Sequence, residues 1–478
     1  MILAAAPLTA AASLPHAAET GAAEPQTSAP MGEVERTIAA GHLPAKSVSY
    51  VIADVDTGRV IASENADAPR SPGSTLKVVT TLASLDTLGP AFTWTTRALA
   101  DGPVVNGVLR GNLYLEGGGD PYMTIERWWY FVQELRATGL QTISGDIVVD
   151  DHGFALPDEN PAAFDGHPNR PYNVIPDAML VNFQTIDFRI APDARAHKVN
   201  VVANPAPLNL RVDNRIRLVG GRCRGRGNRV DFQVSSPRRD RVLLTGALSK
   251  TCPPLEIARA VMRAPAFAAG TFVPIWREAG GGFEGRLREA AAPAGARELL
   301  SYDSLTLGEI VRLTNKYSNN VMARDLLLTM GERRYGAPAT VDKGIAAVEE
   351  WSRARGLDLH GAQVDNGAGL SRIARISAAT LVEVLKYAYH SRYAPEFLAS
   401  LPIAGVDGTL RTSMRDTPPG AVRLKTGHID DASAVAGYVT TARGHTYVLV
   451  SLVNDPRVGA GAAEPVHAAL VDWILRYL

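Results

Sequence analysis

The chain has 478 residues, of which 46% are hydrophobic and 21% charged, which is a globular composition long enough for two or three domains. Lys plus Arg and Asp plus Glu both number 49, so the formal net charge is zero. This balance excludes a general electrostatic attraction to nucleic acid or to an anionic membrane surface.

The first residues of the chain are small and apolar. Residues 1–14 are typical of the apolar core of a secretory signal, with Ala17 and Ala18 near a cleavage point, although no Lys or Arg precedes them. A disordered alanine-rich tail is the alternative. Residues 19–32 have the composition of a linker. Since no later apolar run reaches roughly 18 residues, we expect no transmembrane helix.

The next segments mix strands and a helix. Residues 47–65 alternate apolar and polar side chains around an Asp-Thr-Gly turn, which predicts a β-hairpin. Apolar residues at helical spacing predict a helix that begins at Ser74. Short strands with Gly and Asn turns are expected over 98–151, and arginine-rich strands over 187–248.

Helical patterns return in the second half of the chain. They predict a helix at 254–262 and several helices over 305–389. An amphipathic helix is expected at 464–478. Three strands are expected before it, at 422–426, 432–440 and 445–452. A hairpin near the start and three strands near the end predict one sheet built from both ends of the chain, with the middle inserted.

The chain has two cysteines, Cys223 and Cys252. In an exported protein, this even and minimal number favours one disulfide. Such a disulfide would stabilise the fold by about 3 kcal/mol through the entropy of the closed loop. Two free buried thiols are the alternative.

Ser74 and Lys77 lie one turn apart at the start of the expected helix. A serine hydroxyl becomes a nucleophile when a neighbour takes its proton, and a lysine can do so if burial or nearby positive charge lowers its pKa. The helix N-terminus also favours the negative charge that develops there. On its own, such a pair can also arise by chance in a helix, with Lys77 simply exposed to solvent.

Two further motifs follow along the chain. Ser318 and Asn320 suit a loop between helices, where the hydroxyl can relay a proton and the amide can bind a substrate peptide; alone, they could be a helix cap. Lys425, Thr426 and Gly427 lie on an expected edge strand. The lysine and threonine can bind a carboxylate, and the glycine allows a backbone to approach closely. Alone, this triplet is common in surface strands.

In this order, the three motifs form the serine acyl-transfer set of β-lactamases and penicillin-binding proteins. The gap from Ser74 to Ser318 is more than twice the gap from Ser318 to Lys425, whereas a compact β-lactamase has a much shorter first gap. Over 32–478 the chain resembles the low-molecular-mass class C penicillin-binding proteins, the D-alanyl-D-alanine carboxypeptidase/endopeptidase family. Other stretches that resemble the family are GNLYLEGGGDPYMT, GDIVVDDHGF, PYNVIPDAMLVNF, VDNGAGLSRIARIS and LPIAGVDGTLRTSM.

The resemblance implies a role for each motif residue. It makes Ser74 the acylated nucleophile and Lys77 the base that activates it. Ser318 passes a proton toward the leaving amine, and Asn320 orients the scissile peptide.

The resemblance also implies how substrate is bound. Lys425 and Thr426, next to Gly427, engage the terminal carboxylate of the substrate or the carboxylate of a β-lactam. The oxyanion hole consists of the backbone N–H groups of Ser74 and His428, and one such donor is worth about 3 kcal/mol.

Three further residues match positions that shape the pocket for the diaminopimelic side chain: Asp150, Phe154 and Arg372. Each could instead have a purely structural role: Asp150 as a carboxylate at a strand end, Phe154 as an aromatic side chain of the core, and Arg372 as a surface arginine. The chain departs from the family pattern at His428, where the family has a small hydroxyl residue, and at the acidic pair Asp430 and Asp431. These departures leave substrate preference open.

The resemblance implies a multi-domain α/β fold. Its catalytic domain combines a five-stranded antiparallel sheet with helices, and two mostly-β domains are inserted, one nested within the other. The expected bounds are 1–32 for the signal-like segment and linker, 33–92 and 284–478 for the catalytic domain, 93–186 and 250–283 for the first inserted domain, and 187–249 for the nested domain.

The sequence has no motif typical of a metal site, a nucleotide site or an α/β-hydrolase. The ten histidines form no ligand cluster, and the chain has no Walker A motif, no Gly-x-Gly-x-x-Gly in a strand–helix context and no Gly-x-Ser-x-Gly elbow. We therefore expect no metal, nucleotide or other cofactor. A cluster of arginines fits solvated hairpin faces and leaves peripheral contact with wall polymer or lipid headgroups open: Arg222, Arg224, Arg226, Arg238, Arg239 and Arg241.

These expectations describe a periplasmic serine DD-peptidase. It would cleave D-Ala-D-Ala in peptidoglycan stem peptides through an acyl-enzyme on Ser74, and β-lactams would acylate it. Endopeptidase action on D-Ala–diaminopimelate cross-links is left open, as is the oligomeric state. The alternatives are a β-lactamase or serine esterase, a non-catalytic cell-wall-binding scaffold, and an assembly protein whose inserted domains bind partners.

Overall fold

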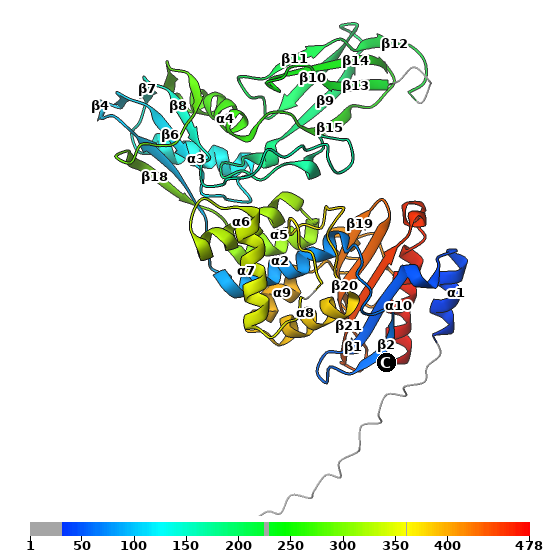
Figure 1. Ribbon diagram of the computed structural model, residues 1–478. Helices are drawn as coiled ribbons and strands as arrows, with labels where there is room; N and C mark the ends of the chain where they lie inside the picture. The colour runs from blue at the N-terminus through cyan, green and yellow to red at the C-terminus, as the bar shows by residue number, and fades with distance from the viewer. Residues whose placement is uncertain (1–30, 224–228, 360) are drawn as a thin grey trace, which may run out of the picture.

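The computed structural model describes residues 31–223, 229–359 and 361–478. The expected signal-like segment up to residue 30, and Arg224 and Arg226 of the arginine cluster, lie outside these residues. The described chain forms two lobes (Figure 1). We call the lobe that contains both chain ends the terminal lobe, and the lobe built from the middle of the sequence the inserted lobe.

A five-stranded antiparallel sheet forms the centre of the terminal lobe. Its strands are β1 (Val48–Asp54), β2 (Val60–Glu64), β19 (Val422–Ile429), β20 (Ala432–Thr440) and β21 (Thr446–Asn454). They lie in the order β19-β20-β21-β1-β2, and β1 pairs with β21 along its whole length. The two ends of the chain therefore build one sheet, as the sequence predicts, and β19 lies at its edge.

Helices cover both faces of this sheet (Figure 1). One face carries α1 (Gly32–Ala40) and α10 (Glu464–Tyr477). The other carries α2 (Lys77–Leu88), α5 (Leu307–Tyr317), α6 (Asn320–Tyr335), α7 (Val341–Ala354), α8 (Ala378–His390) and α9 (Ala394–Ser400). Val51 of β1 packs in the core with α2, whereas Ile52 packs in the core with α10. This period of two is what a strand buried on both faces requires.

The inserted lobe contains two sheets next to two helices. The larger sheet has the strands β17 (Leu287–Glu289), β8 (Ile147–Asp150), β6 (Leu113–Glu116), β3 (Thr95–Ala100) and β18 (Arg297–Asp303), in that order. The smaller has β16 (Gly282–Phe283), β7 (Thr142–Ile143), β5 (Val108–Leu109) and β4 (Val104–Val105). The helices are α3 (Ile125–Ala137) and α4 (Ala264–Glu278).

The arginine-rich strands form two more sheets in the same lobe. One contains β10 (Lys198–Asn204), β9 (Thr185–Asp193) and β15 (Leu255–Ala260); the other contains β11 (Arg211–Asn214), β14 (Arg241–Ser249), β12 (Arg217–Val219) and β13 (Arg229–Val234). Cys223 and Cys252 form a disulfide here, across a sequence separation of 29. Phe188 of β9 and Phe272 of α4 belong to one hydrophobic core, so all four sheets pack as one lobe.

The expected helix at 254–262 is wrong. Most of this range forms β15 (Leu255–Ala260), and α4 begins only at Ala264. Leu255 and Ile257 alternate with polar residues and pair with β9, so sheet pairing decides the structure of this short apolar run.

The chain also returns to the terminal lobe later than expected. The predicted boundary at residue 283 comes too early, because β17 and β18 pair with β8 and β3 of the inserted lobe. The nested boundary at residue 249 is early as well, since β15 pairs with β9. Within the described ranges, no helix combines the length and the apolar character that a membrane span needs.

Candidate active site

The serine of the first motif lies where a 3₁₀ turn passes into an α-helix. The turn η2 (Gly73–Leu76) precedes α2, so the α-helix begins at Lys77 and not at Ser74. Lys77 Nζ donates a hydrogen bond of 2.9 Å to Ser74 Oγ. The two groups are therefore within the distance that direct proton transfer requires.

Two glycines allow η2 to lie against the edge strand β19. A Cβ on Gly427 would be 2.5 Å from the carbonyl oxygen of Pro72 and 2.8 Å from the amide nitrogen of Ser74. A Cβ on Gly73, where φ is +50°, would be 3.2 Å from the amide nitrogen of His428. The amide nitrogens of Ser74 and His428, the two expected oxyanion donors, therefore both lie where η2 packs against β19.

Lys77 is fully buried, and every hydrogen of its ammonium group has an acceptor. Besides Ser74 Oγ, it donates to Asn320 Oδ1 at 2.7 Å and to the carbonyl oxygen of Ala368 at 2.6 Å. Burial, and then the positive charge of Lys425, lower the pKa of Lys77 well below its ordinary value. A lysine in this environment loses its proton more readily than an exposed lysine does.

The second motif lies in the turn between α5 and α6. Ser318 adopts the left-handed conformation (φ 56°, ψ 36°) that ends α5, and the Asn319 side chain caps α6. This tight turn places the Ser318 hydroxyl 2.9 Å from Lys425 Nζ and the Asn320 amide beside Lys77. The second motif thus contacts both of the other motifs.

Lys425 extends from β19 into the same interior. It is fully buried and donates to Ser318 Oγ and, at 2.6 Å, to the carbonyl oxygen of Thr426. Burial lowers the pKa of Lys425 to about 7. The hydroxyls of Thr426 and Thr409 share a hydrogen bond of 2.7 Å. The His428 side chain is exposed, with Nδ1 3.7 Å from a carboxylate oxygen of Glu464.

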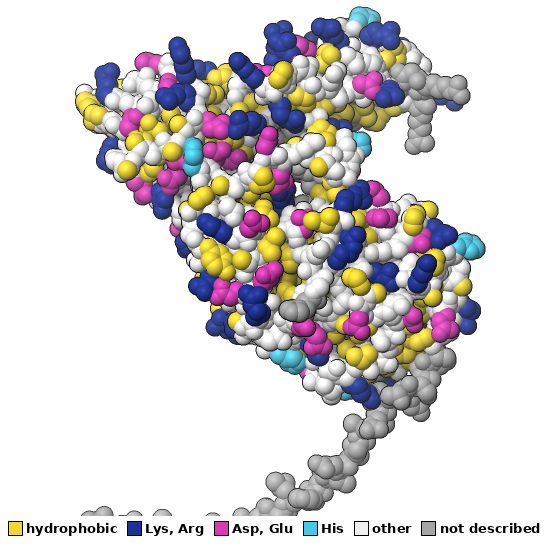
Figure 2. Space-filling model, viewed as in Figure 1, with side chains coloured by type: hydrophobic (Ala, Val, Ile, Leu, Met, Phe, Trp, Pro, Cys, Tyr) yellow, Lys and Arg dark blue, Asp and Glu magenta, His cyan; other side chains and the backbone are white. Residues whose placement is uncertain are grey.

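A cavity of about 520 Å³ lies beside Asn320. Arg372 lines it, donates a hydrogen bond of 2.7 Å to Asp430, and lies over the Phe164 ring at 4.2 Å from its centre. Tyr172 of the inserted lobe also lines it, and its carbonyl oxygen accepts from Asn320 Nδ2 at 3.1 Å. The surface is hollowed here, where the inserted lobe faces the terminal lobe (Figure 2).

Asp150 and Phe154 do not line this cavity. The Asp150 carboxylate accepts hydrogen bonds from the amides of Ala292, at 2.7 Å, and His152, at 3.1 Å. Phe154 packs on Gly119, where an added Cβ would lie 2.8 Å from the Phe154 ring. Both residues thus have partners in the inserted lobe, and Phe154 also forms a β-bridge with Ala339.

Three residues at the site were not singled out from the sequence. Tyr172 lies within one of the stretches that resemble the family, so it had a signal. Thr409 had one too, because it lies within the stretch LPIAGVDGTLRTSM. Phe164 had none, because its contact with Arg372 joins segments that are far apart in the chain.

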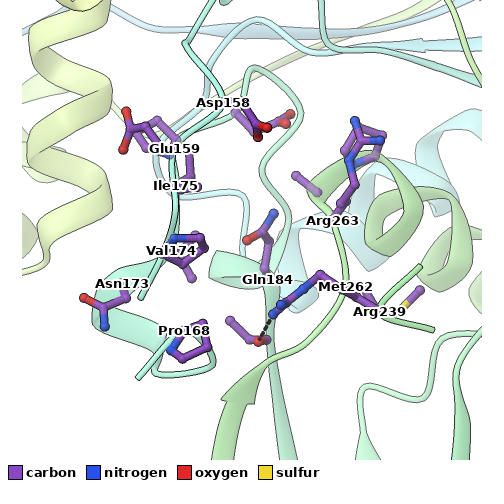
Figure 3. Close-up of a pocket in the computed structure, with 16 residues that line it drawn as sticks. Asp158, Glu159, Pro168, Asn173, Val174, Ile175, Gln184, Arg239, Met262 and Arg263 are labelled. Carbon is purple, nitrogen blue, oxygen red and sulfur yellow. Dashed lines mark hydrogen bonds between the residues drawn. The ribbon is translucent and has the colours of Figure 1, made fainter. Parts of the chain in front are cut away.

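A smaller cavity of about 330 Å³ adjoins the first and shares Glu159, Asn173 and Ile175 with it. Arg239 lines the opposite side from Glu159 (Figure 3). Its guanidinium donates to the carbonyl oxygen of Val261 at 2.6 Å and to Asn169 at 2.7 Å. Arg239 is thus engaged within the fold, which favours the structural explanation for this member of the arginine cluster.

No group of three or more His, Cys, Asp and Glu side chains suited to a metal ion occurs among the residues that the structure describes.

The fold and this arrangement of side chains define a class, the serine acyl-transfer enzymes to which β-lactamases and penicillin-binding proteins belong. The model of the D-Ala-D-Ala carboxypeptidase 3 (S13) family matches residues 31–477. The chain belongs to this family and is a serine-type D-Ala-D-Ala carboxypeptidase by class.

Individual relatives agree with this assignment. The chain is 29% identical over 444 residues to the D-alanyl-D-alanine carboxypeptidase of Actinomadura sp. (strain R39), covering 89% of this chain and 79% of that protein. It is 25% identical to the D-alanyl-D-alanine carboxypeptidase DacB of Haemophilus influenzae, covering 89% of each. The crystal structure of penicillin binding protein 4 (dacB) from Haemophilus influenzae has the same fold, with a TM-score of 0.80 at 24% identity over 94% of this chain and 100% of that chain. The predictions of family, fold class and enzyme class are confirmed.

Proposed function

We propose that this protein hydrolyses the terminal D-Ala-D-Ala peptide bond of peptidoglycan stem peptides through an acyl-enzyme on Ser74. The observation that carries this proposal is the contact of 2.9 Å between Lys77 Nζ and Ser74 Oγ, made by a fully buried lysine. An exposed lysine stays protonated at neutral pH, whereas burial allows Lys77 to accept the serine proton.

Acylation would begin with neutral Lys77. Its lone pair takes the Ser74 proton as Oγ attacks the carbonyl carbon of the penultimate D-alanine. The resulting oxyanion receives hydrogen bonds from the amides of Ser74 and His428, which border one contact between η2 and β19. When the C–N bond breaks, the leaving amine takes a proton from Ser318, and Ser318 in turn recovers the proton that Lys77 took from Ser74, so that Lys77 is neutral again.

Deacylation would use the same groups with water in place of the serine. Lys77 accepts a proton from the water molecule that attacks the ester carbonyl. The C–O bond to Ser74 then breaks, and Oγ recovers a proton from Lys77. One water is consumed for each D-alanine released.

Substrate binding would use both sides of Ser74. On one side, Lys425 and Thr426 bind the terminal carboxylate as a charged and a neutral donor. On the other side, Asn320 binds the amide of the acyl part, and the cavity lined by Arg372 takes the part of the stem peptide beyond it. We do not extend this assignment to Asp150 and Phe154, whose partners lie elsewhere.

We also propose that the protein acts in the periplasm, where peptidoglycan peptides are its partners. The signal-like composition of the first residues and the disulfide between Cys223 and Cys252 support export to an oxidising compartment. Acylation by β-lactams follows from the proposed mechanism, because the lactam amide replaces the scissile peptide and its amine stays attached.

Mass spectrometry after incubation with penicillin tests this function. We expect one stable adduct on the wild type, located at Ser74, and none on Ser74→Ala. We expect D-alanine release from a stem pentapeptide to be lost in the same variant. Rapid loss of the adduct with turnover of penicillin would instead indicate a β-lactamase. A wild type without any adduct would indicate a non-catalytic wall-binding protein and would overturn the proposal.

A further inference from the structure

The hydroxyl of Thr426 has a second hydroxyl beside it. Thr409 Oγ1 lies 2.7 Å from Thr426 Oγ1, although the two residues are 17 positions apart in the chain. Thr409 belongs to the short turn η5 (Gly408–Leu410), and its side chain is exposed, while that of Thr426 is partly exposed. A pair of accessible hydroxyls therefore lies where the proposed function assigns the terminal carboxylate of the substrate.

The contact between the two hydroxyls leaves them able to bind an anion. A hydrogen bond between two hydroxyl groups uses only one of their two hydrogens. When a carboxylate arrives, both O–H groups can rotate and each can donate to one of its oxygens. Hydrogen bonds to an ionised acceptor are stronger than those between neutral groups. The neutral contact between Thr409 and Thr426 would thus be exchanged for two stronger ones.

An ion pair holds η5 against the end of α5. Lys316 is buried in the last turn of α5, and its Nζ donates to the two carboxylate oxygens of Asp407 at 2.8 and 2.6 Å. It also donates to the carbonyl oxygen of Leu401 at 2.6 Å. The Asp407 carboxylate in turn accepts from the amide of Ile403 at 2.8 Å. These bonds close the chain into a tight turn directly before Thr409.

Close packing fixes the turn from both sides. Gly408 has a φ of +58°, and a Cβ there would be 2.7 Å from the carbonyl oxygen of Lys316. On the other side, the amide of Leu424 in β19 donates to the carbonyl oxygen of Pro402 at 3.0 Å. The Thr409 hydroxyl is therefore held beside β19 by the same helix end that leads into Ser318.

We propose that Thr409 is a second direct ligand of the terminal carboxylate of the substrate, and that Asp407 is the positioning residue that holds it beside Thr426. This inference rests on the proposed function, because it concerns the carboxylate end of the same site. It makes the preference for a free terminal carboxylate depend on η5 as well as on β19.

The composition of β19 supports this role. Thr426 carries the only hydroxyl of the strand. The family pattern has a small hydroxyl residue at position 428, which shares a face of the strand with Thr426. His428 stands there in this chain, and its imidazole extends to 3.7 Å from Glu464. A second hydroxyl for the carboxylate therefore has to come from outside β19, and Thr409 provides it.

Two peptides that differ only at the end of the chain test this role. One is the stem pentapeptide with its free carboxylate, and the other is the same peptide with a terminal carboxamide, which keeps the scissile bond and removes the charge. We expect Thr409→Val to lower the ratio of kcat/KM for the acid to kcat/KM for the amide by about tenfold, mainly through KM. Thr409→Ser keeps the hydroxyl and should stay within about threefold of the wild-type ratio.

A double variant tests the positioning role of Asp407. Asp407→Asn keeps the shape of the side chain and removes the ion pair with Lys316, so it should lower the same ratio by about three- to tenfold. If Asp407 acts through Thr409, combining Asp407→Asn with Thr409→Val should give the ratio of Thr409→Val alone. A further loss in the double variant would show that Asp407 does not act through Thr409.

Thr412→Val is the matched control. Thr412 is an exposed threonine just after η5 and should give the wild-type ratio when changed. Cleavage of the carboxamide shows that each variant is folded. Failure of penicillin to label Ser74 in the wild type would overturn the proposed function. Normal labelling together with a wild-type ratio in Thr409→Val would overturn the role of Thr409 alone.

Discussion

Burial changes the chemistry of two lysines at this site. Lys77 and Lys425 are both fully buried, and the charge of Lys425 further lowers the pKa of Lys77. Two adjacent ammonium groups in a dry cleft disfavour each other, so the proton leaves one of them more readily. In the proposed mechanism the two lysines therefore have different roles: Lys77 is the base beside Ser74, and Lys425 is the cation beside Ser318.

We expect the pH dependence of D-alanine release to show the titration of Lys425. Its pKa is lowered to about 7, so its positive charge is present below this pH and lost above it. The value of kcat/KM should therefore decline as pH rises through about 7, because the substrate carboxylate loses its cation. Lys425→Arg should move this decline to higher pH, since a guanidinium stays protonated. Complete pH–rate profiles measure both effects.

Lys386→Arg is the control for this profile. Lys386 is on α8, outside the site, and lies 2.9 Å from Glu383. Its variant should reproduce the wild-type profile. A decline that stays at the same pH in Lys425→Arg would show that another group titrates.

At the scale of elements, the position of the nucleophile depends on one contact between a turn and an edge strand. η2 and β19 approach closely enough that even a methyl group between them would meet backbone atoms. Among the described residues, the outer side of β19 is paired only near its start, through the bridge between Ile403 and Arg423, and no strand pairs with it farther along. The same contact thus brings together the proposed nucleophile, the two proposed oxyanion donors and the strand proposed to bind the carboxylate.

Gly427→Ala should disturb this contact and slow acylation. The new Cβ would lie 2.5 Å from the carbonyl oxygen of Pro72, so the backbone of η2 or β19 has to shift. We expect a loss of about 1–3 kcal/mol in the free energy of unfolding, and acylation by penicillin that is slower by about 100-fold. Urea unfolding and the acylation rate constant measure the two effects.

Gly295→Ala is the control, because a Cβ there meets no atom within 4 Å. It should acylate at the wild-type rate. Wild-type acylation by Gly427→Ala would show that the close approach of η2 and β19 is not needed.

At the scale of the whole molecule, the two lobes meet across buried carboxyl groups. Asp325 of α6 is fully buried, and neither of its side-chain oxygens has a hydrogen-bond partner in the described part of the chain. Burial, together with Asp177 and Asp120 of the inserted lobe, raises the pKa of Asp325 well above its ordinary value. Burial also raises the pKa of Asp120 to about 6 and that of Asp177 to about 7.

These raised pKa values predict that stability falls as pH rises. Above pH 3.8 the unfolded chain releases protons that these carboxyl groups keep in the folded state. Their contribution to the free energy of unfolding is therefore complete at low pH and is lost as pH rises through about 6 to 7 and above. Asp325→Asn cannot ionise and should unfold at a higher temperature than the wild type at pH 8. We expect a gain of at least about 1 kcal/mol there, and a smaller difference at pH 5.

Asp67→Asn changes an exposed carboxylate and serves as the control for this experiment. It should retain the pH dependence of the wild type in thermal unfolding. If Asp325→Asn had the same pH dependence as the wild type, Asp325 would already be ionised in the folded protein.

Much of this protein could be predicted from local patterns. The spacing of Ser74 and Lys77 on one turn, the expected turn at Ser318 and the alternation along β19 depend on neighbours in the chain, so they are readable without a structure. The strands at both ends then predicted the central sheet, and the resemblance to a known family, carried by the three motifs and several other stretches, implied the family and the fold class.

Long-range contacts could not be read in this way. The pairing of β15 with β9 turned an expected helix into a strand, and the pairing of β18 with β3 moved the return to the terminal lobe past residue 283. The Asp150 carboxylate accepts a hydrogen bond from the amide of Ala292, a contact that the sequence did not indicate. Each outcome depends on segments brought together from far apart in the chain.

The sequence by itself therefore determined which reactive groups the protein has and the order in which they occur, because motif spacing is a local property. The tertiary structure decided which of those groups are buried together, what their pKa values become, and that a second hydroxyl lies beside Thr426. The physical reason is that desolvation, close approach and cavity shape arise only when distant segments pack, and no short stretch of sequence encodes them.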